Sequence, residues 1–239
     1  MNRNNNKVSA IIAAKNEAKR IHKVLDIICK SPLVDEVIVV AGGSTDDTCK
    51  IARSYGVCVD DDDSLKGKTL NVRKGLSLAK NDIIFLIDAD LEGLDNDAIE
   101  RLVMPVKSGQ VDMTLSIRKN SALIYKWFGI DFVSGERVLR KELLKDPSIW
   151  SKSNIGYSLE VLMNKSLLSK RKSFIAVNLP KLIAIRKSAK SKHYLTGALS
   201  DAAMVFKIFK ALPFYEVIGQ FFIMSKLNKK YQKLLKLNS

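Results

Sequence analysis

The chain has 239 residues, of which 46% are hydrophobic and 27% are charged. This length and composition exclude a fibrous or wholly disordered chain and are typical of one sizeable α/β core with an appendage. The formal net charge of +15 arises entirely in the second half, because residues 1–120 hold 18 Lys and Arg against 18 Asp and Glu, whereas residues 121–239 hold 22 against 7. Such a field attracts nucleic acid, anionic lipid or a phosphorylated substrate.

The first 120 residues alternate between strand-like and helix-like segments. Predicted strands cover residues 8–14, 36–41, 57–60, 83–88 and 111–117. Predicted helices lie between them, over residues 17–30, over residues 68–79 and near residues 95–108. A further helix is expected to start at Ser44, which forms with Asp47 the S-x-x-D arrangement typical of a helix start. Repeated βαβ units of this kind predict a mostly parallel sheet.

After residue 120 aromatic and basic residues increase, and strands are harder to place. Residues 174–185 are consistent with one or two strands, and apolar and basic residues interleave at helical spacing from about residue 195. The apolar stretch over residues 211–227 is too short to span a bilayer and is interrupted by Glu216, so we expect it to lie on a membrane at most.

The cysteines and the N-terminus bear on the compartment. Cys29, Cys49 and Cys58 are odd in number and form no CxxC pair, which predicts reduced thiols in the core of a cytosolic protein. The opening segment MNRNNNK has no apolar region, so secretion is not expected.

Two aspartates follow the apolar run of IIFLIDADLEGL, which reads as a central strand buried on both faces. Asp88 and Asp90 therefore emerge at the carboxyl end of that strand, the edge of an α/β sheet where ligands bind. Paired carboxylates there predict a hard cation, Mg²⁺ or Mn²⁺, accompanied by a phosphate.

Four short segments fall at or near the ends of predicted strands: AAKNE (13–17), AGGSTDDT (41–48), KGK (66–68) and DAD (88–90). At one sheet edge they would bring together glycine-lined backbone amides, a helix N-terminus at Ser44, the cation of Lys68 and two carboxylates. That combination fits a nucleoside diphosphate bridged by a metal.

The ordered motifs IIAAKNE, DEVIVVAGGSTDDT, LKGKTLNVRKGL and DIIFLIDADL resemble family 2 glycosyltransferases of the GT-A fold. DFVSGERVLRKELL (131–144) continues the match, and GYSLE (156–160) is a weaker one. The nearest resemblance is to small enzymes of the dolichyl-phosphate mannosyltransferase and glucosyl-3-phosphoglycerate synthase type. It implies a Rossmann-like, mostly parallel sheet flanked by helices in a domain over residues 1–200, with a nucleotide-sugar half (1–120), an acceptor half (121–200) and a basic amphipathic helical extension (201–239).

The resemblance also implies site residues. Those facing the nucleoside would be Ala13, Ala14, Asn16, Glu17 near the ribose, Gly43 and Ser44 on the base side, and Asp88. Lys68 would meet the phosphates, and Asp90 would hold the metal on the diphosphate as the catalytic Lewis acid. Ser134 and Gly135 would shape the acceptor pocket, with Glu160 binding the acceptor or acting as general base.

The sequence departs from the family pattern at three places. Many relatives have two aspartates where this chain has Ala41 and Gly42, and one of them commonly reads the nucleobase, so the base specificity stays open. Proline is usual at the position of Ala13. Some relatives place a metal-binding histidine where this chain has Ala184, and His193 is displaced from that position.

These observations predict an enzyme that moves a sugar from a nucleotide-sugar donor, with Mg²⁺ or Mn²⁺, to a lipid-linked or phosphorylated acceptor. The alternative is a catalytically degenerate protein of the same fold at a membrane surface. A nucleotidyltransferase would carry a glycine-rich signature that AAKNEAKR lacks, and a haloacid dehalogenase phosphatase would have Gly-Thr after its D-x-D. Nucleic acid is not expected as a partner, and the oligomeric state stays open.

The C-terminal segment further predicts reversible contact with the anionic inner face of a membrane, and hence a cytoplasmic protein held peripherally. On one helix its apolar residues would form a stripe flanked by lysines. The stripe would contain Phe206, Phe209, Phe214, Phe221, Phe222 and Leu227, beside Lys207, Lys210, Lys226, Lys229 and Lys230. The competing interpretation is that this stripe packs on the catalytic domain or on a second subunit.

Overall fold

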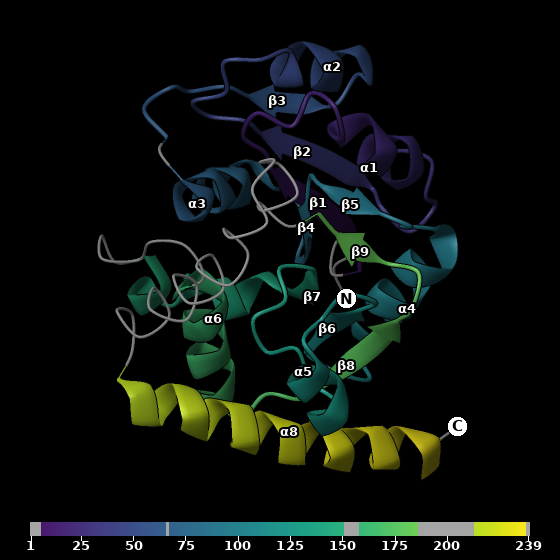
Figure 1. Ribbon diagram of the computed structural model, residues 1–239, viewed down its shortest axis with the longest axis vertical. Coiled ribbons are helices and arrows are strands. Elements are labelled where there is room, and N and C mark those ends of the chain that lie inside the picture. The colour runs from purple at the N-terminus through teal and green to yellow at the C-terminus, as the bar shows by residue number, and fades with distance from the viewer. Residues whose placement is uncertain (1–5, 66, 151–157, 186–212, 238–239) are drawn as a thin grey trace.

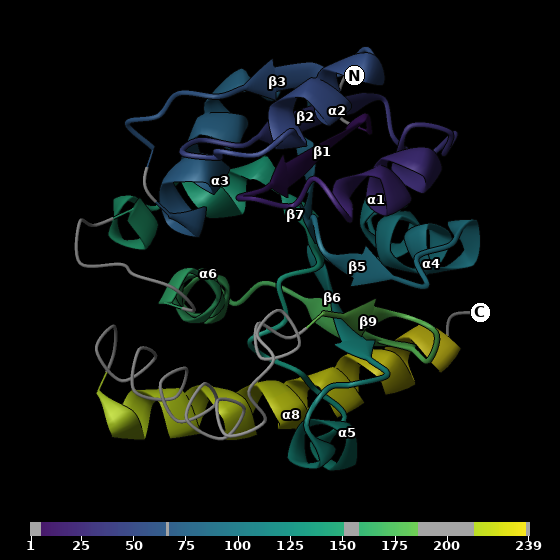
Figure 2. The same ribbon diagram turned by 45° about the horizontal axis from the view of Figure 1, so that its top comes forward.

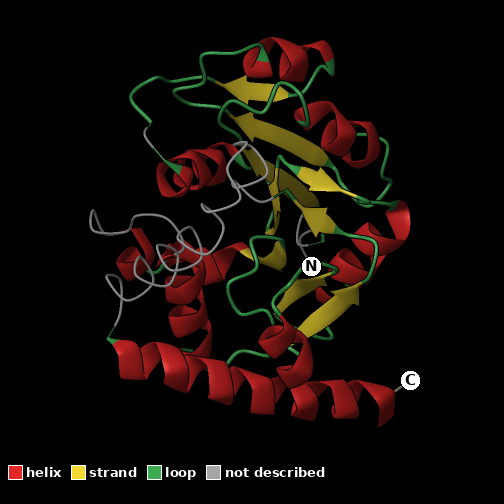
Figure 3. Ribbon diagram, viewed as in Figure 1, coloured by secondary structure: helices red, strands yellow, loops and turns green. Residues whose placement is uncertain are grey.

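The computed structural model describes residues 6–65, 67–150, 158–185 and 213–237. Within them a seven-stranded sheet has the order β3-β2-β1-β4-β7-β6-β8 (Figures 1 and 3). Its strands are β1 (Val8–Ala13), β2 (Glu36–Val40), β3 (Cys58–Asp60), β4 (Ile83–Asp88), β6 (Met113–Arg118), β7 (Arg137–Arg140) and β8 (Phe174–Leu179). A second sheet pairs β5 (Leu91–Glu92) with β9 (Ile183–Ala184), so residues 174–185 form two strands.

Helices cover both faces of the large sheet, as Figures 1 and 2 show. The apolar residues on one face pack against α3 (Lys68–Leu78), α6 (Ser158–Ser169) and α8 (Phe214–Leu237). Those on the other face pack against α1 (Ile21–Ile28), α2 (Thr48–Ser54) and α4 (Asn96–Lys107). The helix α5 (Leu123–Phe128) follows β6, and the 3₁₀ turns η1 (Lys141–Lys145) and η2 (Pro147–Trp150) precede α6.

The predicted mostly parallel sheet is confirmed. Strands β1, β2, β3 and β4 pair in parallel, as do β6 and β8, and only β7 among these strands runs antiparallel to its neighbours. The strand β4 is buried on both faces, with Leu86 in one apolar layer and Phe85 in the other. Because Ala13 lies opposite both Val40 and Asp88, the carboxyl ends of β1, β2 and β4 form one edge.

The predicted helix start at Ser44 is wrong, because α2 begins at Thr48 with Asp47 as its N-cap residue. The Ser44 hydroxyl accepts the backbone N–H of Asn16 instead of capping a helix. The carboxylate of Asp46 accepts the Thr48 N–H, which fixes the helix start four residues later. The loop over residues 41–47 is therefore tied to the loop after β1.

The prediction of core cysteines is also wrong. All three thiols are free, but Cys29 and Cys58 are exposed and Cys49 is half-buried. Cys29 lies just beyond the buried face of α1, which ends at Ile28, so its side chain falls on the solvent side. These thiols contribute little to the apolar layers.

The helix α8 is bound to the edge of the large sheet through backbone groups of β8. The Ala176 N–H donates to Asn228 Oδ1 at 2.8 Å, and Gln232 Nε2 donates to the Ala176 carbonyl at 2.9 Å. These two side chains, four residues apart on one helix face, occupy the place that a further strand would take. Asn228 also donates to the carbonyl of Gly129 at 2.8 Å.

The predicted apolar stripe on this helix is partly wrong. Phe221 is only 6% exposed and packs inside the domain, and Leu227 is half-buried, whereas Phe214 and Phe222 are 62% and 53% exposed. Phe206, Phe209, Lys207 and Lys210 lie outside the described residues, as does His193. Within the described part of the chain, none of the helices has the unbroken apolar length that crossing a bilayer requires.

We expect Asn228→Ala to lower the free energy of unfolding by about 2–6 kcal/mol, because two backbone groups, the Ala176 N–H and the Gly129 carbonyl, would each lose a partner at a cost of about 1–3 kcal/mol. Asn228 is 2% exposed, whereas the neighbouring Lys230 is exposed, so Lys230→Ala is the matched control. Urea unfolding followed by circular dichroism measures both variants. Equal stability of the two would show that α8 is not held by this side chain.

Candidate active site

Two loops at the carboxyl edge of the sheet are bonded to each other. The residue Asn16 has a left-handed backbone with φ of 56°. Its N–H donates to Ser44 Oγ at 3.2 Å, and its side-chain oxygen accepts the Thr45 N–H at 2.8 Å. The Glu17 N–H donates to Thr48 Oγ1 at 2.8 Å. The structure thus brings together the predicted nucleoside residues Asn16, Glu17 and Ser44.

Close packing accounts for the glycine found where many relatives have an aspartate. A Cβ atom added to Gly42 would lie 2.6 Å from the Asp62 carbonyl oxygen and 2.7 Å from Leu65 Cβ. The loop over residues 62–65 therefore fills the space of a side chain at this position. Gly43, the next residue, has φ of +70°, a conformation that favours glycine.

Ala13 and Ala14 lie at the end of β1, beside β2. The Ala14 N–H donates to the Val40 carbonyl at 2.9 Å. Buried Asn71 of α3, which the sequence did not single out, donates weakly from Nδ2 to the carbonyls of Ala14 and Val40, at 3.4 Å each. The sequence could have indicated a role for Asn71, because it is a polar residue on the inner face of a predicted helix, and buried polar groups require hydrogen-bond partners.

The centre of the site is Lys68, the first residue of α3. Its Nζ lies 2.8 Å from Asp88 Oδ1 at the end of β4 and 3.0 Å from Glu160 Oε1 on α6. A Cβ atom at Gly135 would lie 2.7 Å from the same Nζ and 2.6 Å from Asp88 Oδ2. Four predicted site residues therefore meet, and glycine at position 135 leaves room for them.

This ion cluster is enclosed on one side and open on the other. The side chain of Glu160 is 2% exposed, whereas those of Lys68 and Asp88 are 32% and 24% exposed. Burial works to lower the pKa of Lys68, but the adjacent Asp88 and Glu160 carboxylates raise it above its usual value, so the ammonium stays charged. Among the described residues, Glu160 Oε2 finds no hydrogen-bond partner although it is buried.

Asp90 lies two residues beyond Asp88 and is half-buried, immediately before β5. Its carbonyl accepts the Ile185 N–H at 3.2 Å, next to the pairing of Leu91 with Ala184. Ala184, at the position where some relatives have a histidine, therefore lies beside Asp90. The side chain of Asn120 holds the Ala184 backbone there: its Nδ2 donates to the Ala184 carbonyl at 2.7 Å, and its Oδ1 accepts the Ala184 N–H at 3.3 Å.

The donor set at this edge fits a hard divalent cation that shares its ligands with a substrate. In the part of the chain that the structure describes, no group of three His, Cys, Asp or Glu residues is arranged to hold a metal. Asp88 is paired with Lys68, and Asp90, two residues further on, is the carboxylate that the family resemblance assigns to the ion. Mg²⁺ is typically bound by one or two carboxylates together with substrate phosphates, so this set suffices.

The adjacent residues Ser134 and Gly135 face different parts of the protein. Ser134 is fully buried, and its hydroxyl lies 2.6 Å from Ser116 Oγ and donates to Glu136 Oε2 at 2.9 Å. This hydroxyl therefore points into the protein, whereas Gly135 faces Lys68 and Asp88. Of the two predicted acceptor residues, only Gly135 borders the ion cluster.

Arg137 supports the site and was missed by sequence reasoning. It is fully buried in β7, where its guanidinium donates to the carbonyls of Ser134 and Phe132 and to Asn164 Oδ1, at 2.7, 2.6 and 2.6 Å. A fourth bond, to the Glu160 carbonyl at 3.3 Å, ties α6 to the same group. Burial lowers the pKa of Arg137. The sequence feature that could have identified Arg137 is an arginine at the start of a segment with apolar residues, Val138 and Leu139.

A second ion cluster lies at the end of β6. Arg118 is 3.5 Å from Asp131 Oδ2 and 3.4 Å from Glu136 Oε1, and both carboxylates are 1% exposed. Burial raises the pKa of Asp131, against the opposing effect of Arg118. Because Glu136 also holds Ser134, this cluster fixes the segment that carries Gly135.

Comparisons with known proteins agree with this geometry. The family model for glycosyl transferase family 2 matches residues 9–162. The 4,4'-diaponeurosporenoate glycosyltransferase of Staphylococcus aureus (strain USA300) is 38% identical over 108 residues, which are 43% of this chain and 29% of that protein. The chain therefore matches less than a third of that relative's length.

Glucosyl-3-phosphoglycerate synthase from Mycobacterium tuberculosis shares the fold. Its complex with phosphoglyceric acid has a TM-score of 0.67 at 23% identity, covering 86% of this chain and 80% of that one. Its complex with Mn²⁺, uridine diphosphate and phosphoglyceric acid has a TM-score of 0.69 at 22% identity, covering 90% and 78%. The expected GT-A fold is confirmed, and the chain belongs to glycosyl transferase family 2.

Proposed function

We propose that this chain transfers a sugar from a nucleoside diphosphate sugar to an acceptor hydroxyl, with Mg²⁺ or Mn²⁺. In this reaction the bond between the anomeric carbon and the diphosphate oxygen breaks, and a bond to the acceptor oxygen forms. The nucleoside diphosphate leaves with the electron pair, and the acceptor hydroxyl loses its proton. The observation that carries the proposal is the meeting of Lys68, Asp88 and Glu160 at the carboxyl edge of the sheet.

The donor would lie across the ends of β1, β2 and β4. Asn16, Glu17 and Ser44 would border its nucleoside, and Lys68 would meet its diphosphate. Diphosphate oxygens would then compete with Asp88 and Glu160 for the Lys68 ammonium. When bound at Asp90, a divalent cation would neutralise charge on the leaving diphosphate, which is a Lewis-acid role. The synthase of the same fold has been crystallised with Mn²⁺ and uridine diphosphate glucose.

The acceptor would approach from the side of α6 and Gly135. The buried Oε2 of Glu160, which has no hydrogen-bond partner among the described residues, would accept a hydrogen bond from the acceptor hydroxyl or take its proton. We propose a phosphorylated or lipid-linked acceptor. The fold relative binds phosphoglyceric acid and glycerol 3-phosphate, and the sequence relative is named for transfer to 4,4'-diaponeurosporenoate. The excess of lysine and arginine after residue 120 suits such anionic molecules.

We further propose that the protein works in the cytoplasm and attaches reversibly to the anionic inner face of a membrane. The basic second half of the sequence supports this location. A lipid-linked acceptor would already lie in that surface. The location and the transfer reaction are separable, because donor turnover is measured without any membrane.

A panel of nucleoside diphosphate sugars, incubated with the protein and Mn²⁺, tests the transfer. Release of nucleoside diphosphate from at least one donor, increased by phosphorylated or lipid-linked acceptors, is the expected result. Donor binding without release from any sugar would favour the alternative, a catalytically degenerate member of the family.

We expect Asp90→Asn to lower turnover by about two orders of magnitude or more, because metal stabilisation of the leaving group is worth several kcal/mol. Mn²⁺ binding in the presence of uridine diphosphate, followed by calorimetry, should weaken in parallel. Asp97→Asn is the matched control, since the side chain of Asp97 on α4 is 70% exposed and pairs with Arg101 of the same helix at 3.7 Å. Full turnover of Asp90→Asn in excess chelator would contradict the metal assignment.

We also expect weak discrimination between bases. With Ala41 and Gly42 in place of a base-reading aspartate, uridine and guanosine diphosphates should compete within roughly a hundredfold, since one buried hydrogen bond is worth about 1–3 kcal/mol. Competition calorimetry with Mn²⁺ measures the ratio. A much larger preference would mean that another residue reads the base.

A further inference from the structure

Large apolar side chains are exposed on two neighbouring helices, α5 and α8. On α5, Leu123 is 82% exposed and Trp127 is 85% exposed. Among the described residues outside α5 and α8, the most exposed large apolar side chains are Leu70 on α3 and Met104 on α4, at 40% and 39%. Such a concentration marks an interaction site.

The two helices form one continuous surface. Ser225 Oγ of α8 donates to the Phe128 carbonyl at 2.7 Å, which holds the end of α5 against α8. The ring of Phe128 lies 5.8 Å from that of Trp127 and 5.6 Å from that of Phe222, measured between centroids. Figures 1 and 2 both show α5 beside the middle of α8.

The outer face of α8 has an apolar half and a basic half along its length. The inner face of this helix is buried and contains Val217, Phe221, Met224 and Asn228 at spacings of three and four residues. The outward stripe begins with aromatic and aliphatic residues and continues with lysines. In order it contains Tyr215, Ile218, Phe222, Lys226, Lys229 and Lys233, all of them exposed.

The charge of this surface has one sign. The helix α8 has five lysines and a single acid, Glu216, which is paired with Lys165 of α6 at 2.8 Å. The sequence from Lys119 to Ile130, which includes α5, contains no acidic residue. Lysines beside exposed aromatic residues match the headgroup region of a bilayer with anionic lipids, where tryptophan is also favoured.

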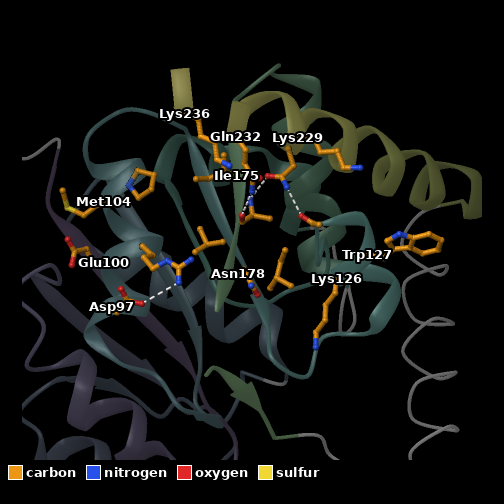
Figure 4. A pocket seen from close by; sticks show the side chains of 17 residues that line it. Asp97, Glu100, Met104, Lys126, Trp127, Ile175, Asn178, Lys229, Gln232 and Lys236 are labelled. Carbon is orange, nitrogen blue, oxygen red and sulfur yellow. Dashed lines mark hydrogen bonds and ion pairs between the residues drawn. The ribbon is translucent and has the colours of Figure 1, made fainter. Parts of the chain in front are cut away.

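A groove of about 990 Å³ between α4, β8, α5 and α8 marks the boundary of this surface (Figure 4). Trp127 and Lys229 extend to the same side of the view, while the acidic Asp97 and Glu100 of α4 lie at the opposite rim. The sign of the charge therefore changes across the groove, so the basic, apolar surface ends there.

We propose that α5 and the outer face of α8 seat this protein on a bilayer that contains anionic lipids, with Leu123 and Trp127 inserted at the level of the headgroups. A second copy of the chain with its α8 helix parallel to the first fits this surface poorly, because that two-fold contact would bring two sets of α8 lysines together. The inference deepens the proposed membrane location and does not depend on sugar transfer. The sequence pattern pointed only to the C-terminal segment, whereas α5 supplies the most exposed side chains.

Fluorescence of single-tryptophan variants tests the insertion, since Trp127 and Trp150 are the two tryptophans of the chain. Trp150→Phe leaves Trp127, whose emission should shift to the blue with vesicles of phosphatidylglycerol and phosphatidylcholine and should be quenched by brominated acyl chains. Trp127→Phe leaves the half-buried Trp150, which should respond to neither. An unchanged Trp127 emission with anionic vesicles at low salt would overturn the proposal.

Vesicle sedimentation with full-length variants separates charge from insertion. The triple change Lys226→Gln, Lys229→Gln and Lys233→Gln should weaken binding about a hundredfold, at about fivefold for each lysine. The matched control replaces the exposed Lys30, Lys50 and Lys80 with Gln and should bind like the parent. Leu123→Ser should weaken binding about tenfold, whereas Leu70→Ser should not.

Two further measurements identify the cause of a failure. Nucleotide-sugar hydrolysis without vesicles should be the same in all these surface variants and the parent. An active protein that ignores anionic vesicles would overturn the membrane surface alone, and an inert protein that binds them would overturn the transfer alone. A dimer in sedimentation velocity that Leu123→Ser dissociates would assign the surface to a second copy and overturn the proposal.

Discussion

The contact of Lys68 with Asp88 and Glu160 unites the two halves of this protein. One ammonium lies within 2.8 and 3.0 Å of carboxylates from β4 and α6, 20 and 92 residues away along the chain. A buried carboxylate without a cation would be costly, so each half of the site stabilises the charge of the other. A diphosphate that reached Lys68 would therefore alter the surroundings of Glu160 as well, and under the proposed function this would couple donor binding to the acceptor side.

The surrounding structure keeps this contact in place. Arg137 holds the carbonyls of Ser134 and Phe132 together with α6, and the nearby Arg118 cluster fixes the same segment from the end of β6. Gly135 is thereby held against Asp88 with no space for a side chain. The same helix α6 that carries Glu160 also carries Lys165, which is bonded to α8. The helix α6 thus connects the ion cluster of Lys68 with the proposed membrane surface.

Much of the arrangement in the first 120 residues was predictable, because parallel strands place their carboxyl ends at one edge. Asp88 ends the strand β4, and Lys68 begins the helix α3. The meeting with Glu160 was not predictable, since only tertiary packing relates residues so distant in sequence. A helical pattern of apolar residues likewise does not reveal which of them pack against other elements. Phe221 is buried and the adjacent Phe222 is exposed, because neighbouring positions on a helix differ in direction by about 100°. The helix α5, with six residues, is too short to show a periodic pattern of apolar residues in the sequence. Its exposed side chains form part of a larger surface only because α5 packs against α8.

One departure from the family pattern, Gly42, has a local explanation, and this bears on whether the departures indicate lost function. At Gly42 the loop over residues 62–65 occupies the space of the missing side chain, so the substitution and the loop form one packed arrangement. At Ala184 the backbone is still bonded to Asn120 and still pairs beside Asp90. The buried ion cluster of Lys68, whose charges cost free energy to bury, is intact beside these departures. Under the proposed function, the donor site would rely on Asp90, Lys68 and the diphosphate itself, with fewer contacts to the base.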